Sequence, residues 1–168
     1  EARGGRRGPE NVWGSALVAA VLAALTPLAG AQASLLLLGF AASLGAKLAD
    51  TFGSEIGKRW GRHTVLITNL RPVARGTEGA ISLEGTAASV VGSGLMAAVM
   101  AALGVIETPS ALALVTAVGV AATLVESLIG ATLQGRIAWL SNEVVNGLQT
   151  LVGALLAMGL ALAFRLLI

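Results

Sequence analysis

A polar stripe runs through an otherwise apolar stretch of the sequence. Lys47, Asp50, Ser54 and Lys58 are spaced i, i+3, i+7 and i+11, so they share one face of a helix, and Glu55 lies beside them. A charge at the centre of a membrane-spanning helix costs ~2.5 kcal/mol or more. One reading is an ion-pair ladder whose side chains reach the lipid headgroups. We favour a polar binding site, because the stripe has counterparts elsewhere in the chain.

Two further polar stripes belong to later apolar segments. The first contains Glu126, Gly130 and Gln134, and the second contains Asn142, Asn146 and Gln149. Each set recurs at three or four residues, which places its members on one helix face. A single Asn would more often cap a helix or bond to a neighbouring helix. Three stripes that end on the same side of a membrane predict one pocket open to that side.

A Gly-rich polar segment supplies further candidates. The string RPVARGTEGAISLEGT contains Arg71, Arg75, Gly76, Thr77, Glu78 and Gly79. Glycines let backbone N–H groups approach an anion closely, and Arg forks match phosphate oxygens. The GTEG stretch alone is weak evidence, because it lacks the Lys-Ser/Thr that ends a P-loop. Together with the carboxylates it predicts binding of Mg²⁺ and a polyphosphate. A zinc site is disfavoured, since the chain has one His and no Cys.

The composition places these residues in a membrane. Hydrophobic residues make up 55% of the 168 residues and charged residues only 12%, whereas soluble domains are about 25% charged. This excludes a soluble enzyme, a nucleic-acid-binding protein and a disordered chain. The pI of 9.9 arises from a net charge of only +2, so there is no basic patch and nucleic acid is not an expected partner.

The positions of the apolar runs predict an all-α integral membrane protein, a single polytopic domain over residues 1–168. A spanning helix needs about 20 mainly apolar residues, and Pro27 and Gly30 divide the long first run. The predicted five transmembrane helices cover residues 12–26, 32–60, 87–106, 109–134 and 142–165. The long polar Gly/Arg-rich loop, residues 58–86, lies between the second and third helices and should contain neither helix nor strand.

Positive charges set the orientation of such a protein. With five spans, nine of the eleven Lys and Arg residues fall on one side: Arg3, Arg6, Arg7, Lys58, Arg59, Arg62, Arg71, Arg75 and Arg136. The first two loops on the opposite side carry no Lys or Arg. The basic side, with the predicted pocket, should therefore face the cytoplasm, or the stroma in a plastid.

Three strings resemble a known family. RRGPENVWGSA, KLADTFGSEIGKRWGRHTVLITNLRPVARGTEGAISLEGT and ESLIGATLQGRIAWLSNEVVN are similar to the integral-membrane family that contains plant and cyanobacterial phytyl-phosphate kinases. With Glu126 and Arg75 at these positions, the strings resemble those of the photosynthetic branch of that family. Members usually carry further hydrophobic segments upstream, so the resemblance implies an N-terminally trimmed form. It also implies a chloroplast envelope or cyanobacterial membrane.

The resemblance implies a nucleotide-dependent phosphotransferase that makes phytyl diphosphate from phytyl phosphate, with CTP preferred, for tocopherol and phylloquinone synthesis from salvaged phytol. As a hypothesis, the Mg²⁺ ligands and catalytic acids are Asp50, Glu55, Glu78 and Glu126. The phosphate-binding residues are Lys47, Ser54, Lys58, Arg71, Arg75, Gly76, Thr77 and Gly79, and those on the acceptor side are Gln134, Asn142 and Asn146. The isoprenoid tail should lie between helices, reached from the bilayer.

Other functions stay open on the sequence alone. A looser similarity to dolichol and phytol kinases predicts an isoprenoid alcohol as acceptor. Intramembrane acids in Gly-interrupted helices also occur in small ion-coupled transporters, but the inverted repeat that such a protein predicts is at most faint here. The choice of CTP, ATP or UTP and the presence of a homodimer also remain open.

Overall fold

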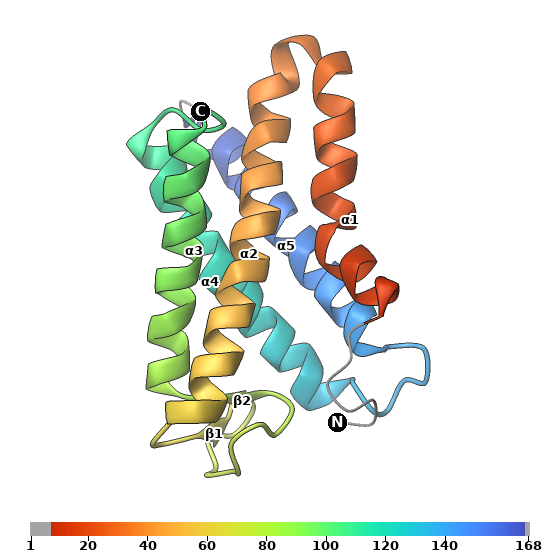
Figure 1. Ribbon diagram of the computed structural model, residues 1–168, viewed down its shortest axis with the longest axis vertical. Helices are drawn as coiled ribbons and strands as arrows, with labels where there is room; N and C mark the ends of the chain where they lie inside the picture. The colour runs from red at the N-terminus through yellow and green to blue at the C-terminus, as the bar shows by residue number, and fades with distance from the viewer. Residues whose placement is uncertain (1–7, 167–168) are drawn as a thin grey trace.

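The computed structural model describes residues 8–166 and is a bundle of long helices (Figure 1). The α-helices are α1 (Pro9–Leu25), α2 (Ala33–Trp60), α3 (Leu83–Ala102), α4 (Pro109–Thr132) and α5 (Asn142–Ala163). Two short 3₁₀ turns, η1 (Thr26–Leu28) and η2 (Gly30–Gln32), join α1 to α2. Five helical segments are long and apolar enough to cross a membrane. The predicted all-α membrane fold is confirmed.

The helix ends differ from the predicted ranges where local capping decides them. Helix α3 begins at Leu83, four residues earlier than predicted, because Ser82 caps it: the Gly85 N–H donates to Ser82 Oγ at 3.1 Å. Helix α4 ends at Thr132, so Gln134 lies in the following turn and not on the helix. Helix α1 begins at Pro9, whose fixed φ suits the first turn.

The segment between α2 and α3 was wrongly predicted to contain no strand. It holds an antiparallel pair of two-residue strands, β1 (Val65–Leu66) and β2 (Ala80–Ile81), and the Ile67 N–H donates to the Gly79 carbonyl at 3.0 Å. Such short strands leave too little period-2 alternation to be visible in a Gly-rich sequence. The pair closes the segment into a compact loop beneath the bundle, as Figure 1 shows.

Helix α2 lies at the centre and contacts all four other helices. Glycines allow its close approach to α3: a Cβ at Gly92 would lie 2.7 Å from the Leu48 carbonyl oxygen, and one at Gly85 would lie 2.9 Å from the Gly53 carbonyl oxygen. In a membrane there is no hydrophobic driving force between helices, and small residues at the contacts let the helix backbones approach closely enough to pack.

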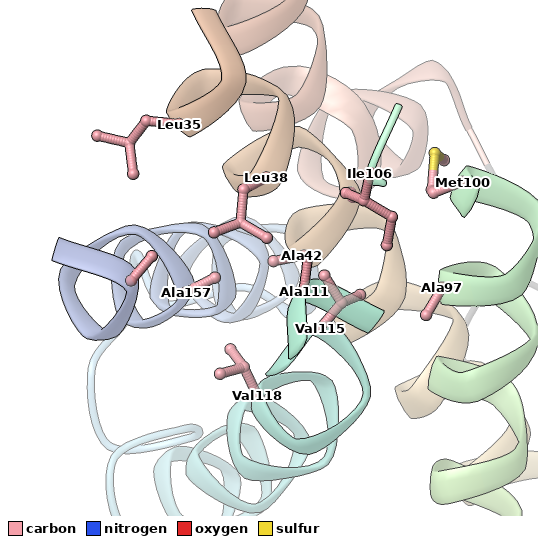
Figure 2. Close-up of a cluster of buried hydrophobic side chains, with 12 residues drawn as sticks. Leu35, Leu38, Ala42, Ala97, Met100, Ile106, Ala111, Val115, Val118 and Ala157 are labelled. Carbon is pink, nitrogen blue, oxygen red and sulfur yellow. The ribbon is translucent and has the colours of Figure 1, made fainter. Parts of the chain in front are cut away.

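The two ends of the bundle have opposite character. The end away from β1 and β2 is filled by a buried apolar cluster drawn from all helices except α1 (Figure 2). Leu38, Val115 and Ala157 lie at its centre and are fully buried. The outward faces carry large exposed apolar side chains, among them Val21, Leu95 and Leu155, as expected for surfaces in contact with lipid. Polar side chains are concentrated inside the other end.

Candidate functional site

A polar pocket lies inside the bundle end that β1 and β2 cover. Helices α2, α3, α4 and α5 form its walls together with Asn11 of α1, and the loop around β2 closes it from below. It brings together most of the residues predicted from the polar stripes: Lys47, Asp50, Ser54, Glu55, Lys58, Gly76, Thr77, Glu78, Glu126, Asn142 and Asn146. The prediction of one shared pocket agrees with this arrangement.

The inner part of the pocket is organised around Lys47. Its Nζ donates to Asp50 Oδ2 at 2.8 Å and to Asn146 Oδ1 at 2.9 Å. Both partners of the ion pair are largely buried, with 19% of the Lys47 side chain and 14% of the Asp50 side chain exposed. Because Asn146 belongs to α5, the Lys47 ammonium also ties α2 to α5. These contacts hold a carboxylate, an ammonium and an amide at defined positions.

A buried amide supports this arrangement one turn deeper. Gln149, fully buried on α5, donates from Nε2 to the Ala46 carbonyl at 2.9 Å and to Thr123 Oγ1 at 3.2 Å. It therefore connects α5 with both α2 and α4 next to Lys47. Its Oε1 is buried without a protein partner. Gln149 fixes the register of the helices that carry the inner pocket residues.

Glu126 brings a second carboxylate to the pocket from α4. It lines the same pocket as Lys47, Asp50 and Glu78. The acids therefore come from α2, α4 and the loop and converge on one space. Glu55, Lys58 and Glu78 are exposed and form the solvent side of the pocket, whereas Lys47 and Asp50 form its inner side.

The acids do not form a complete metal cage by themselves. Among residues 8–166, no three His, Asp or Glu side chains are grouped closely enough to hold a metal ion. Mg²⁺ commonly takes only one or two protein carboxylates and fills its other positions with water and substrate phosphates. The hard oxygen donors of Asp50, Glu78 and Glu126 fit that mode of binding, so Mg²⁺ stays a prediction that depends on a bound phosphate.

Four of the predicted residues do not line the pocket. Arg75 donates from Nη1 to the Arg59 carbonyl at 3.1 Å, and Arg71 is exposed, with its backbone N–H bonded to Asn69 Oδ1. Gln134 follows the end of α4, and Gly79 packs on α4. The turns of the loop, which residue spacing does not encode, direct both arginines to its outer surface.

Gly79 has a packing role that the sequence did not predict. Its φ is +73°, and a Cβ there would collide with the Ala131 Cβ and lie 2.6 Å from the Ser127 carbonyl oxygen. Only glycine fits a left-handed position pressed against a helix backbone. Gly79 thus docks the loop on the last turns of α4 and places Glu78 beside the pocket.

We expect Gly79→Ala to displace the loop and to reduce both thermal stability and any activity of the site. Gly104→Ala is the matched control, because Gly104 also has a positive φ, +68°, but has no atom within 4 Å of an added Cβ. Strain alone should cost about 1 kcal/mol at both positions, and the collision should add to it only at Gly79. Thermal unfolding of the two purified variants measures the difference. An equal loss of thermal stability in the two variants would show that the loop does not dock on α4.

Hydroxyl groups that were not predicted as site residues complete the lining. They are Thr51, Thr64, Ser82, Thr86, Ser89, Thr123 and Ser127. Ser and Thr are common in membrane helices, where they bond to their own backbone; here Ser89 donates to the Gly85 carbonyl. The one available signal was helical spacing, since Thr123 lies three residues before Glu126 and four before Ser127.

Comparison with known proteins identifies the family. The profile described as integral membrane protein DUF92 matches residues 1–154. The chain belongs to the DUF92 family. This confirms the membership in a membrane family with plant and cyanobacterial members that the sequence motifs indicated, and a multi-pass membrane location.

Several curated proteins are similar to this DUF92 chain. An uncharacterized membrane protein of Synechocystis, sll0875, is 48% identical over 95% of the chain and 62% of its own length. Protein VTE6, chloroplastic, of Arabidopsis thaliana is 44% identical over 94% of the chain and 48% of its own length. An uncharacterized membrane protein of Methanocaldococcus jannaschii, MJ0933, is 38% identical over 71% of the chain and 49% of its own length. The chain thus spans about half to two thirds of these relatives. No solved structure matches it.

Proposed function

We propose that this DUF92 chain transfers the terminal phosphate of a nucleoside triphosphate to phytyl phosphate and so forms phytyl diphosphate. The observation that carries the proposal is the pocket itself: half-buried Lys47 and Asp50, exposed Lys58 and Glu78, and Glu126 line one space at one end of a membrane bundle. Such a pocket suits a substrate with a highly charged head and a lipid tail. The similarity to the chloroplastic plant protein and the motif resemblance agree with it.

The proposed reaction needs no dedicated general base. A phosphate monoester has a second pKa of about 6, so its oxygens are ionised near neutral pH. One of them attacks the γ-phosphorus, the bond from that phosphorus to the bridging oxygen breaks, and the nucleoside diphosphate leaves. What the protein must supply is neutralisation and in-line alignment of two anions. The shortage of His residues in the chain is therefore compatible with this chemistry.

The positions of the pocket residues suggest a division of roles. Lys58 lies at the mouth next to Gly76, whose added Cβ would lie 3.8 Å from the Lys58 Cγ, so the nucleotide phosphates should bind there. Lys47, with Asn146 and Asn142, should hold the acceptor phosphate at the inner end. One or two of the carboxylates of Asp50, Glu78 and Glu126 would hold Mg²⁺ together with the substrate phosphates, and the ion when bound would neutralise phosphate charge.

The same geometry predicts the side of the membrane on which the site opens. In the described part of the chain, Lys58, Arg59, Arg62, Arg71, Arg75 and Arg136 lie at or next to the pocket end. Arg3, Arg6 and Arg7, which were counted with them, lie outside the described residues. By the positive-inside rule the pocket should open to the cytoplasm or the stroma.

An ion-coupled transporter is less compatible with the packing. A transport path has to reach both faces of the membrane, but the half of the bundle beyond the pocket is filled by Leu38, Val115, Ala157 and their neighbours (Figure 2). An isoprenoid alcohol kinase would need a group that deprotonates a hydroxyl. Asp50 is already paired with Lys47, so in an alcohol kinase that role would fall to Glu78 or Glu126 of the same pocket.

Acceptor specificity tests the proposal. Purified protein in lipid nanodiscs, supplied with MgCl₂, should convert phytyl phosphate to phytyl diphosphate, with CTP preferred to ATP and UTP, and should leave phytol unchanged. Product analysis by mass spectrometry distinguishes monophosphate from diphosphate. Phosphorylation of phytol alone would transfer the assignment to an alcohol kinase, and solute uptake by proteoliposomes without phosphate transfer would favour a transporter.

A further inference from the structure

The pocket has two sides of different chemistry. Asn11 of α1 and Asn142 and Asn146 of α5 contribute amides, whereas α4 contributes the apolar Val120 and Leu124 beside its polar lining residues. Leu124 lines the pocket and is 36% exposed, and Leu128, one turn further along the same face of α4, is 46% exposed. A lipid-facing leucine that reaches the inside of a polar pocket indicates that this side opens toward the bilayer.

The edges of that opening are defined by contacts between helices. Toward the apolar end, α3 and α4 are held together because Ser93 Oγ donates to the Val115 carbonyl at 3.1 Å. Toward the loop, Gly79 packs on Ser127 and Ala131 of α4. Figure 1 shows α3 and α4 adjacent near the C-terminus and separated near β2. Ser93 also packs on Gly119, where an added Cβ would lie 2.9 Å from the Ser93 Cβ. The stretch of α4 from Gly119 to Ser127 is therefore about 12 Å long at 1.5 Å per residue.

We propose that the prenyl chain of the lipid phosphate passes between α3 and α4, in a portal flanked by Thr86 on α3 and by Val120 and Leu124 on α4. This inference rests on the proposed function and names the subsite for the substrate tail. The phosphate head lies with Lys47 at the inner end of the pocket, and the chain extends past Leu124 into the bilayer. The nucleotide enters from the solvent side near Lys58, so the two substrates do not share an entrance.

The polarity of the pocket lining explains why the prenyl chain of the substrate should leave the pocket past α4. Where α1 and α5 line the pocket, they present the amides of Asn11 and Asn142, and an apolar tail there would displace the water from these groups, which is costly. Past Val120 and Leu124 the tail meets apolar surface and lipid. The portal therefore lets the charged head remain in the pocket while the tail stays in the bilayer.

Protection of a single thiol tests the portal without relying on turnover. The chain has no cysteine, so L124C can be labelled selectively with a membrane-permeant maleimide in nanodiscs. Phytyl phosphate at ten times its Kd should slow labelling about tenfold. A five-carbon prenyl phosphate, which has the same head without the long tail, should not. L95C is the matched control, since Leu95 is 50% exposed on α3 and does not line the pocket.

A kinetic comparison gives the second readout. Leu124→Trp should raise the KM for phytyl phosphate more than the KM for the five-carbon phosphate, whereas Leu95→Trp should alter neither. Equal labelling rates of L124C with and without phytyl phosphate, in a protein that still makes the diphosphate, would contradict the proposed portal. The proposed kinase activity would not be affected. Slower labelling of L124C by maleimide without any phosphate transfer would support the portal and contradict the proposed kinase activity.

Discussion

Asp50→Asn should lower phosphate transfer by about 10²- to 10³-fold, the usual loss when one group that stabilises the transition state is removed. The amide has nearly the same size as the carboxylate and can still accept a bond from Lys47 Nζ, which lies 2.8 Å from Asp50 Oδ2. It cannot neutralise a cation. We therefore expect a folded protein that binds lipid in detergent but does not turn over. Steady-state rates and thermal unfolding of the same preparation measure both properties.

Glu107→Gln is the matched control for that variant. Glu107 is an exposed carboxylate in the turn between α3 and α4, at the end of the bundle away from the pocket. Its substitution removes one negative charge from the protein without touching the site, so the rate should stay unchanged. Near-normal turnover of Asp50→Asn would remove Asp50 from the proposed role, whatever the effect on stability.

Lys47→Met should affect stability as well as activity. The ammonium pairs with a carboxylate that is 14% exposed and also donates to Asn146. Its removal leaves a buried charge without a partner, which costs about 3 kcal/mol in comparable cases. The acceptor phosphate also loses its proposed cation, so we expect a further loss of about 10²-fold in rate. Thermal unfolding and turnover together define the effect.

The double variant Lys47→Met/Asp50→Asn separates the two effects. Removing both charges relieves the unpaired carboxylate, so stability should recover toward that of the unmodified protein, and the two single effects should not add. Turnover should remain as low as in the single variants. Recovery of turnover along with stability would show that the ion pair has only a structural role.

The helical part of the site could be predicted from the sequence because helix geometry is regular. The i, i+3, i+7 spacing places Lys47 and Asp50 on one face of α2, and the same periodicity turns Asn146 of α5 toward the bundle interior. Neither fact gives the 2.9 Å contact between Lys47 and Asn146, which depends on how α2 and α5 pack. The apolar runs similarly indicate five spans, but they do not show which helix lies at the centre.

The loop was predicted less well because its conformation depends on turns and tertiary contacts. Arg75 was expected in the pocket from its residue type, yet it bonds to the Arg59 carbonyl on the outer surface. Gly79 was expected to cradle a phosphate, but its positive φ serves close packing on α4. Ser82 ends the loop early by capping α3. None of these contacts follows from residue spacing alone.

Transfer of labelled phosphate tests the central claim most directly. Purified protein is incubated with γ-³²P-labelled CTP, MgCl₂ and phytyl phosphate, and the lipid products are separated. We predict label in the terminal phosphate of phytyl diphosphate for the unmodified protein and for Glu107→Gln, and almost none for Asp50→Asn. Absence of label from the lipid with CTP, ATP and UTP alike, or equal labelling by Asp50→Asn, would contradict phosphate transfer in this pocket.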